Sequence, residues 1–117
     1  MHIVLNSKFF HTLSVPELAV KARELGFDGI DVCVRPGHPV HPANVETALP
    51  QAVTAWNAQG LLCPLATAPV TLANPDAPEV EPLYAGCAAA GVPRVKIGFF
   101  PFTPGEDYWA LVDAARR

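Results

Sequence analysis

Three stretches of the sequence decide the expected fold: KARELGFDGIDVCV (residues 21–34), AWNAQGLLCPLA (55–66) and AAAGVPRVKIG (88–98). In each, an apolar helix-like run ends at a glycine (Gly26, Gly60 or Gly91), and a strand-like run follows within a few residues. Glycine just after a helix closes it because glycine adopts the left-handed conformation without steric cost. The glycines recur about every 30 residues, the length of one strand and its crossover helix. With an opening strand at 2–6, the chain predicts four parallel β-α units.

The composition is that of a globular protein. Its 117 residues suit one domain, with 50% hydrophobic and 16% charged residues. A net charge of −3 without a Lys/Arg cluster argues against a nucleic-acid partner. No apolar run approaches the roughly 20 residues that cross a bilayer, and no signal-peptide pattern precedes the first strand. Cys33, Cys63 and Cys87 are expected to be reduced core residues, rather than a disulfide or metal cluster, of a cytoplasmic protein.

The residue pattern places each element. Strands are expected at 2–6, 29–34, 61–66 and 94–99, and helices at 14–26, 44–59, 79–90 and 106–117. Ser14 followed by Glu17 forms a capping-box pattern. Pro50 requires a kink or a later start of the second helix. Trp56 and Trp109 occupy helical positions and are expected to be packing residues.

The connecting loops are unequal in length. Joints from helix to strand are short, whereas joints from strand to helix are long and hold most of the 13 prolines. Parallel β-α units place every strand-to-helix loop at the carboxyl edge of the sheet, where such folds bind ligands. The alternative is that these loops only cover the end of the sheet. The pattern favours a binding edge.

Polar residues alternate with apolar ones in three of the expected strands. In the second strand Ile30, Val32 and Val34 alternate with Asp31, Cys33 and Arg35; the first and fourth strands place Asn6 and Lys96 on the polar side. A sheet covered by helices on both faces has continuous aliphatic strands instead. A barrel explains the alternation, since apolar side chains face the helices and polar ones the lumen. The alternative is solvation of the edge strands of an open sheet, which explains one such strand but less easily three.

Several residues at this edge are candidates for ligand binding. Asp31 and Lys96 on the lumen face need partners or a function; an ion pair of Asp31 with Arg35 or Lys96 is the structural alternative. Arg35 suits an anionic substrate, and His38 follows it in a loop. His38 and His41 are three residues apart, but their proline-broken loop disfavours a two-histidine metal site. Asn6 and Thr67 end strands and have hydrogen-bonding groups for substrate hydroxyls, although such residues also serve as simple strand caps.

The stretch SVPELAVKARELGFDGIDVCVRPGHPVHP (14–42) resembles the opening of sugar-phosphate isomerases/epimerases of the xylose isomerase-like TIM-barrel superfamily. The segments PANVE (42–46), LPQAV (49–53), LCPLAT (62–67) and RVKIGFF (94–100) extend the similarity over nearly the whole chain. The resemblance implies a single partial domain at 1–117, the first half of a (β/α)8 barrel. Motifs of nucleotide-binding loops and common hydrolases (GxGxxG, GxSxG, HExxH) are absent.

The resemblance implies metal-assisted proton transfer through an enediolate on a sugar or sugar phosphate. The divalent ion of such enzymes (Mn, Mg, Co or Zn) is held by later strands, so no metal ligand or catalytic carboxylate is assigned here. The residues expected to contact substrate are Asn6, Asp31, Arg35, His38, Thr67 and Lys96. The alternative is a non-catalytic half-barrel or small sugar-binding module. Either would expose two sheet edges, so self-association or poor solubility is expected.

Overall fold

The computed structural model describes residues 1–116 and shows an α/β fold built on one four-stranded sheet. The strands are β1 (Val4–Asn6), β2 (Gly29–Cys33), β3 (Leu62–Thr67) and β4 (Val95–Lys96). They pair in the order β1-β2-β3-β4, and every pair is parallel. The predicted fold class is confirmed.

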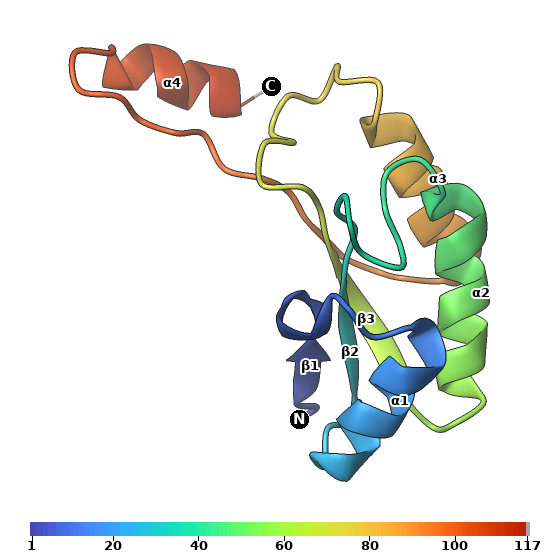
Figure 1. Ribbon diagram of the computed structural model, residues 1–117. Coiled ribbons are helices and arrows are strands. Elements are labelled where there is room, and N and C mark those ends of the chain that lie inside the picture. The colour runs from blue at the N-terminus through green and yellow to red at the C-terminus, as the bar shows by residue number, and fades with distance from the viewer. Residues whose placement is uncertain (117) are drawn as a thin grey trace.

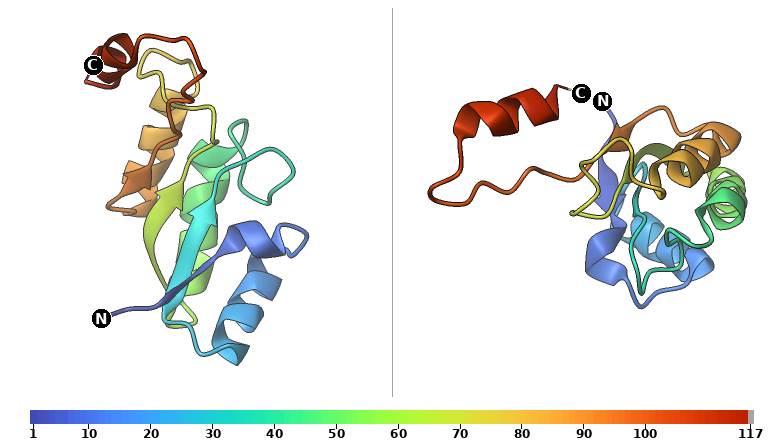
Figure 2. Two further views of the ribbon diagram at one scale, coloured as in Figure 1. Left: turned by 90° about the vertical axis from the view of Figure 1, so that its left-hand side faces the viewer. Right: turned by 90° about the horizontal axis from the view of Figure 1, so that it is seen from above.

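Three crossover helices lie on one face of the sheet: α1 (Val15–Glu24), α2 (Val45–Asn57) and α3 (Val80–Ala90). Figure 1 shows them side by side on the right of the strands, and the view from above in Figure 2 shows the same one-sided row. A doubly wound sheet has helices on both faces and a reversal in strand order. Sequential order with one covered face is the arrangement of successive units in a (β/α) barrel, here four of them.

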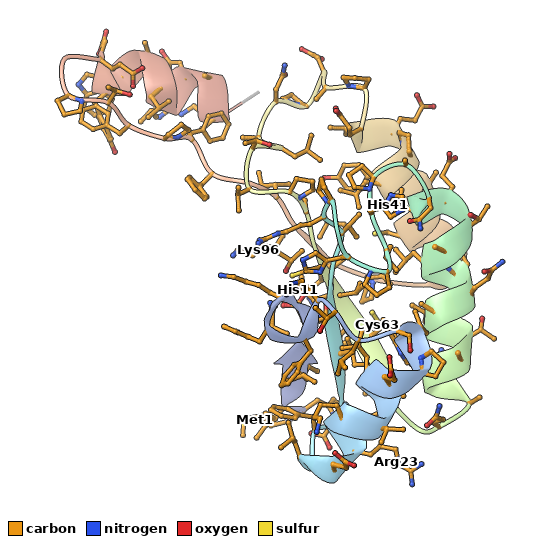
Figure 3. The ribbon with its side chains drawn as sticks, in the orientation of Figure 1. Met1, His11, Arg23, His41, Cys63 and Lys96 are labelled. Carbon is orange, nitrogen blue, oxygen red and sulfur yellow. The ribbon has the colours of Figure 1, made fainter. Side chains whose placement is uncertain are left out.

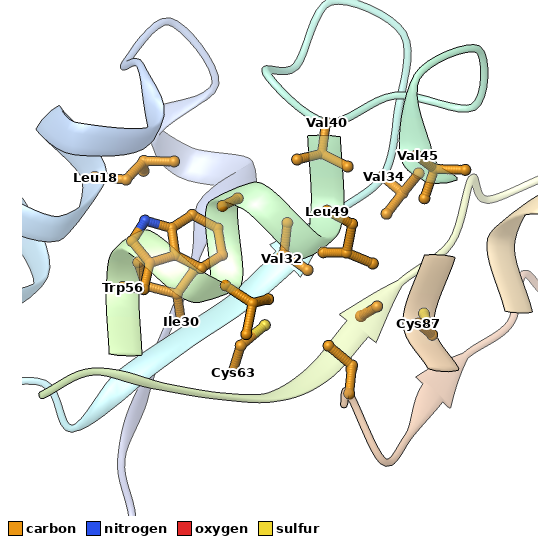
Figure 4. Close-up of a cluster of buried hydrophobic side chains, with 14 of the residues drawn as sticks. Leu18, Ile30, Val32, Val34, Val40, Val45, Leu49, Trp56, Cys63 and Cys87 are labelled. Carbon is orange, nitrogen blue, oxygen red and sulfur yellow. The ribbon is translucent and has the colours of Figure 1, made fainter. Parts of the chain in front are cut away.

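The core lies between the sheet and this row of helices. Ile30, Val32 and Val34 of the second strand region face Leu18 of α1 and Leu49 of α2, and all are buried (Figure 4). Trp56 is 1% exposed, and its Nε1 donates a hydrogen bond of 2.9 Å to the Val15 carbonyl. This bond fixes α2 to the first turn of α1. The packing role predicted for Trp56 is confirmed.

The predicted helix ends are also found. Ser14 N donates to Glu17 Oε2 at 2.7 Å and Glu17 N donates to Ser14 Oγ at 3.5 Å, which completes the capping box. Gly26, Gly60 and Gly91 have φ values of 76°, 77° and 70°, as expected for glycines that close helices. Helix α2 begins at Val45 and runs through Pro50, so the proline does not delay its start.

An irregularity marks the pairing of β2 with β3. Gly29 pairs with Leu62 and Asp31 with Leu65, so Cys63 and Pro64 together oppose one residue of β2. Proline cannot donate to a ladder, and a bulge is where a central strand tolerates it. A Cβ on Gly29 would lie 2.8 Å from the Leu62 carbonyl carbon. Gly29 therefore allows the two backbones to approach at the bulge.

The two edge strands are shorter than predicted. β1 begins at Val4 rather than at residue 2, and a 3-10 helix not foreseen from the sequence, η1 (Ser7–Phe10), follows it. β4 covers two residues rather than 94–99. Beyond Lys96 the backbone bonds to the loop after β3, with Gly98 N donating to Leu72 O at 2.8 Å and Phe99 N to Val70 O at 3.2 Å. The loop has replaced the end of β3 as the pairing partner.

The last helix differs most from the prediction. α4 spans Tyr108–Ala115, so it starts two residues later than predicted, because Asp107 Oδ1 accepts the Trp109 amide at 2.9 Å and caps the helix there. Residue 117 lies outside the described residues. α4 stands apart from the three-helix row (Figure 1), and Trp109 is 68% exposed. The packing role predicted for Trp109 is wrong within this chain, because the helix lies away from the core.

All three cysteines are free and buried, as predicted. Among residues 1–116, no helix is long and apolar enough to cross a membrane.

Candidate functional site

Three of the predicted site residues meet on the face of the sheet opposite the helices. Asp31 is 7% exposed, and its Oδ2 accepts a hydrogen bond of 2.7 Å from Asn6 Nδ2. Its Oδ1 accepts one of 2.9 Å from Thr67 Oγ1. The three side chains come from the neighbouring strands β1, β2 and β3: Asn6 and Thr67 are the last residues of their strands, and Asp31 is the middle residue of β2. We call these residues the Asp31 cluster.

The ion pair considered for Asp31 does not form. Among residues 1–116, the ion pairs are Lys21–Glu24 and Arg116–Asp113, both on the surface. Neutral donors on the two flanking strands, Asn6 Nδ2 and Thr67 Oγ1, bond to the carboxylate instead. A buried carboxylate requires such hydrogen bonds, and here each oxygen has one.

Cys33 orients the amide of Asn6. Cys33 Sγ lies 3.3 Å from Asn6 Oδ1, and the Lys8 amide donates to the same oxygen at 2.9 Å. Burial raises the pKa of the Cys33 thiol, so the thiol stays protonated and donates. With Oδ1 occupied by two donors, Asn6 turns its NH2 group toward Asp31. Sequence reasoning assigned Cys33 to the core and missed this role.

Lys96 is on the same face but outside the cluster. It pairs in register with Thr67, which places both side chains on the open face by strand alternation. Lys96 is exposed, and Figure 3 shows it at the carboxyl edge of the sheet. It is a cation near the Asp31 cluster rather than a partner within it.

Arg35 and His38 line a pocket of about 520 Å³ between the loops that follow β2 and β3. One wall is the loop after β2, and the other is the loop after β3. The polar side chains of the lining are those of Arg35, His38, Thr71 and Glu79; the apolar part is Pro36, Pro42, Pro69, Val70, Leu72 and Ala77. The long strand-to-helix loops therefore form a cavity at the predicted edge.

The loop after β2 is held in shape by its own backbone. The Arg35 amide donates to Val40 O at 3.3 Å, and the His38 amide donates to Arg35 O at 3.1 Å. Gly37 has a φ of 80°, which lets the chain reverse between them. Val40 is buried in the core and anchors the loop. The side chains of Arg35 and His38 are thus presented by an ordered turn.

His38 contacts His11 rather than His41. The rings of His11 and His38 have centroids 5.8 Å apart. His11 follows η1, whereas the His41 amide donates to Asn44 Oδ1 at 2.8 Å near the start of α2 (Figure 3). Sequence reasoning missed His11; its position in the first strand-to-helix loop was the available signal.

Two nitrogens of this pocket contact no hydrogen-bonding group within the described chain. They are Arg35 Nε and His38 Nδ1, and both atoms are buried. Burial lowers the pKa of His38, and the charges of His11 and Arg35 lower it further. His38 is therefore neutral at pH 7. An uncharged imidazole beside a guanidinium can bond to a hydroxyl while Arg35 binds an anion.

The lowered pKa of His38 predicts a pH dependence of stability. The folded state resists protonation of His38. The contribution of neutral His38 to the free energy of unfolding is therefore complete above the ordinary pKa of 6.5, and it is lost as the pH falls through the lowered pKa. We expect the free energy of unfolding, measured in urea, to decrease more between pH 7.5 and 5.5 for the wild type than for His38→Asn. His2→Gln, at an exposed position, serves as the control. Equal decreases for wild type and His38→Asn would contradict the assignment.

No metal centre is built by the described residues. Within 1–116, no three His, Cys, Asp or Glu side chains are grouped to hold an ion. No protein-family model matches the chain, and a search of curated proteins finds no match.

Proposed function

We propose that this chain builds part of the site of a sugar or sugar-phosphate isomerase/epimerase of the xylose isomerase-like kind. One observation supports this most directly: the Arg35/His38 pocket lies between the loops that follow β2 and β3, at the carboxyl edge of the parallel sheet that also carries the buried Asp31 cluster. Ligands of α/β barrels bind at this edge. The resemblance of residues 14–42 to that superfamily points to the same class of substrate.

The chemistry of the pocket suits a small polyol with an anionic group. A volume of about 520 Å³ lies within the range of small-molecule sites. Arg35 offers a fork of donors for phosphate or carboxylate. His38 and Thr71 offer neutral hydrogen-bonding groups for hydroxyls. Glu79, the acidic residue of the lining, provides an acceptor for a hydroxyl further from the anion.

The metal that the resemblance implies does not fit the described residues. Both oxygens of Asp31 already accept hydrogen bonds, and no cluster of potential ligands surrounds it. In enzymes of this kind a divalent ion stabilises an enediolate. We assign the residues of this chain to binding and orientation alone.

Calorimetric titration tests the proposal. The chain should bind a ketose phosphate more tightly than the free ketose or inorganic phosphate. Arg35→Gln should weaken binding of the phosphate ester by about tenfold or more, the effect of losing a charge-assisted contact of about 1.5–3 kcal/mol. Lys21→Gln, which removes a surface cation of α1, is the matched control. Absence of binding, or equal losses for Arg35→Gln and Lys21→Gln, would overturn the proposal.

A non-catalytic sugar-binding module is the second candidate. It is favoured by the engagement of both Asp31 oxygens, which leaves this carboxylate poorly placed to remove a proton from carbon. Incubation of the chain with a ketose phosphate in D2O tests whether the chain by itself moves a proton. Exchange of a carbon-bound proton for deuterium, followed by NMR, supports isomerase or epimerase chemistry and contradicts the module. Binding without exchange is the result expected both of the module and of a chain that supplies only the binding part of an isomerase site.

A further inference from the structure

The segment after β4 carries apolar side chains that its own chain does not cover. Tyr108 and Trp109, at the start of α4, are 57% and 68% exposed. Their rings lie 5.3 Å apart, and Phe102 adds a third ring 6.5 Å from Tyr108. No residue of α4 is buried. An eight-residue helix is not stable on its own in water, so its apolar face needs a partner.

The chain exposes more surface than a compact monomer of its mass, and the excess is close to the area that one partner buries in a dimer. The surface measures 7086 Å². A compact monomer of 12.5 kDa exposes about 6,200 Å², so the excess is about 900 Å². A standard interface buries about 800 Å² on each partner. The radius of gyration, 15.4 Å against about 13.4 Å for a compact chain of this length, reflects the same projecting arm.

Helix α1 offers a groove that complements the aromatic end of α4. Leu13, Pro16 and Val20 line a hollow of about 320 Å³ on its surface, edged by Glu17, Lys21 and Glu24. Val20 is 54% exposed although it lies at the centre of a helix. α1 is the first helix of the row and has a helix neighbour, α2, on one side (Figures 1 and 2). Its other side is open to a second molecule.

The sheet has matching edges. β1 and β4 are the outer strands of an all-parallel sheet in sequential order. A twofold axis parallel to the strands would pair β4 of each copy with β1 of the other. It would keep every strand parallel and join two four-stranded sheets into an eight-stranded barrel, the size at which side chains fill the interior. In that arrangement α4 follows β4 and comes beside α1 of the second copy.

We propose that the partner of this surface is a second copy of the chain. The Tyr108–Trp109 end of α4 packs in the Leu13–Pro16–Val20 groove of the other molecule, while β4 pairs with its β1. Two such equivalent contacts close the dimer, and the open faces that carry the Asp31 clusters turn toward each other. This inference is independent of the proposed function, since it concerns the edges and the arm rather than the Arg35/His38 pocket.

Sedimentation equilibrium of the whole chain tests the dimer. We expect a mass of twice 12.5 kDa at micromolar concentration. Val20→Glu and Trp109→Glu each place a charge in the contact, and each should raise the dissociation constant at least tenfold. Thr54→Glu is the matched control because it adds the same charge at an exposed position of α2, the middle helix. Circular dichroism verifies that each variant remains folded.

Several outcomes would overturn this inference. They are a wild-type monomer, a dimer that neither Val20→Glu nor Trp109→Glu weakens, and open-ended aggregation in place of a closed dimer. Dissociation by Thr54→Glu as well would show a non-specific effect of charge and also contradict it. Ligand binding plays no part in the measurement, so a failed dimer and a failed binding site are distinguishable.

Discussion

Trp56→Ala is expected to lower the free energy of unfolding by about 4 kcal/mol, within the range for truncating a buried tryptophan. The side chain is 1% exposed and lies between α1, α2 and the sheet. Removing it opens a cavity in the middle of the core and also leaves the Val15 carbonyl without its hydrogen bond from Nε1. Urea denaturation followed by circular dichroism measures the loss.

Two further variants separate the contributions of Trp56. Trp56→Phe retains an aromatic ring but removes the donor, so we expect a smaller loss, about 2 kcal/mol. Phe9→Ala truncates an aromatic side chain that is 73% exposed, and we expect a change within about 0.5 kcal/mol. If Trp56→Ala cost no more than Phe9→Ala, the tryptophan would not lie in the core described here.

Gly29→Ala has the second large expected effect, a loss of about 3 kcal/mol from overpacking. An added Cβ would collide with the Leu62 carbonyl oxygen, and it would lie 2.8 Å from the carbonyl carbon and 3.0 Å from the nitrogen of the same residue. These are backbone atoms of a paired strand, so they cannot move aside as a flexible side chain would. The bulge at Pro64 would have to shift. Thermal or urea unfolding measures the loss.

Gly26→Ala is the control for this prediction. Gly26 has a φ of 76° and nothing within 4 Å of the Cβ position, so alanine there meets backbone strain but no collision. We expect a cost of about 1–2 kcal/mol, the penalty of a left-handed non-glycine residue. A smaller loss for Gly29→Ala than for Gly26→Ala would show that the two strands are not in close approach at the bulge.

The sequence predicts the layered architecture well because several local signals indicate it independently. Glycines after helices, the Ser14–Glu17 box and the alternation around Asp31 each specify a short segment, and the segments agree with one another. Strand alternation placed Asn6 and Asp31 on the polar side of their strands, and the expected strand ends placed Asn6 and Thr67 at the carboxyl edge of the sheet. The ion pair considered as an alternative for Asp31 does not form, and its neutral partners were not foreseen because the hydrogen bonds between strands depend on register, which single-strand patterns do not specify.

Other features depend on contacts between distant segments. The shortening of β4 follows from the loop at 70–72, which takes over the pairing of Gly98 and Phe99. The meeting of His11 with His38 depends on η1, whose SKFF sequence has no helical period to reveal it. The position of α4 could not be read from its apolar pattern, since that pattern indicates a face to be covered without saying what covers it.

The central claim is that the loops after β2 and β3, at the carboxyl edge of the sheet, form a binding site for a sugar phosphate. Titration of the 15N-labelled chain with a ketose phosphate, followed residue by residue through its amide NMR signals, tests this most directly. The account predicts saturable shifts at Arg35, His38 and the 67–72 segment, which diminish in Arg35→Gln. Shifts confined to α4 or to the amino edge of the sheet, or no shifts at all, would contradict it.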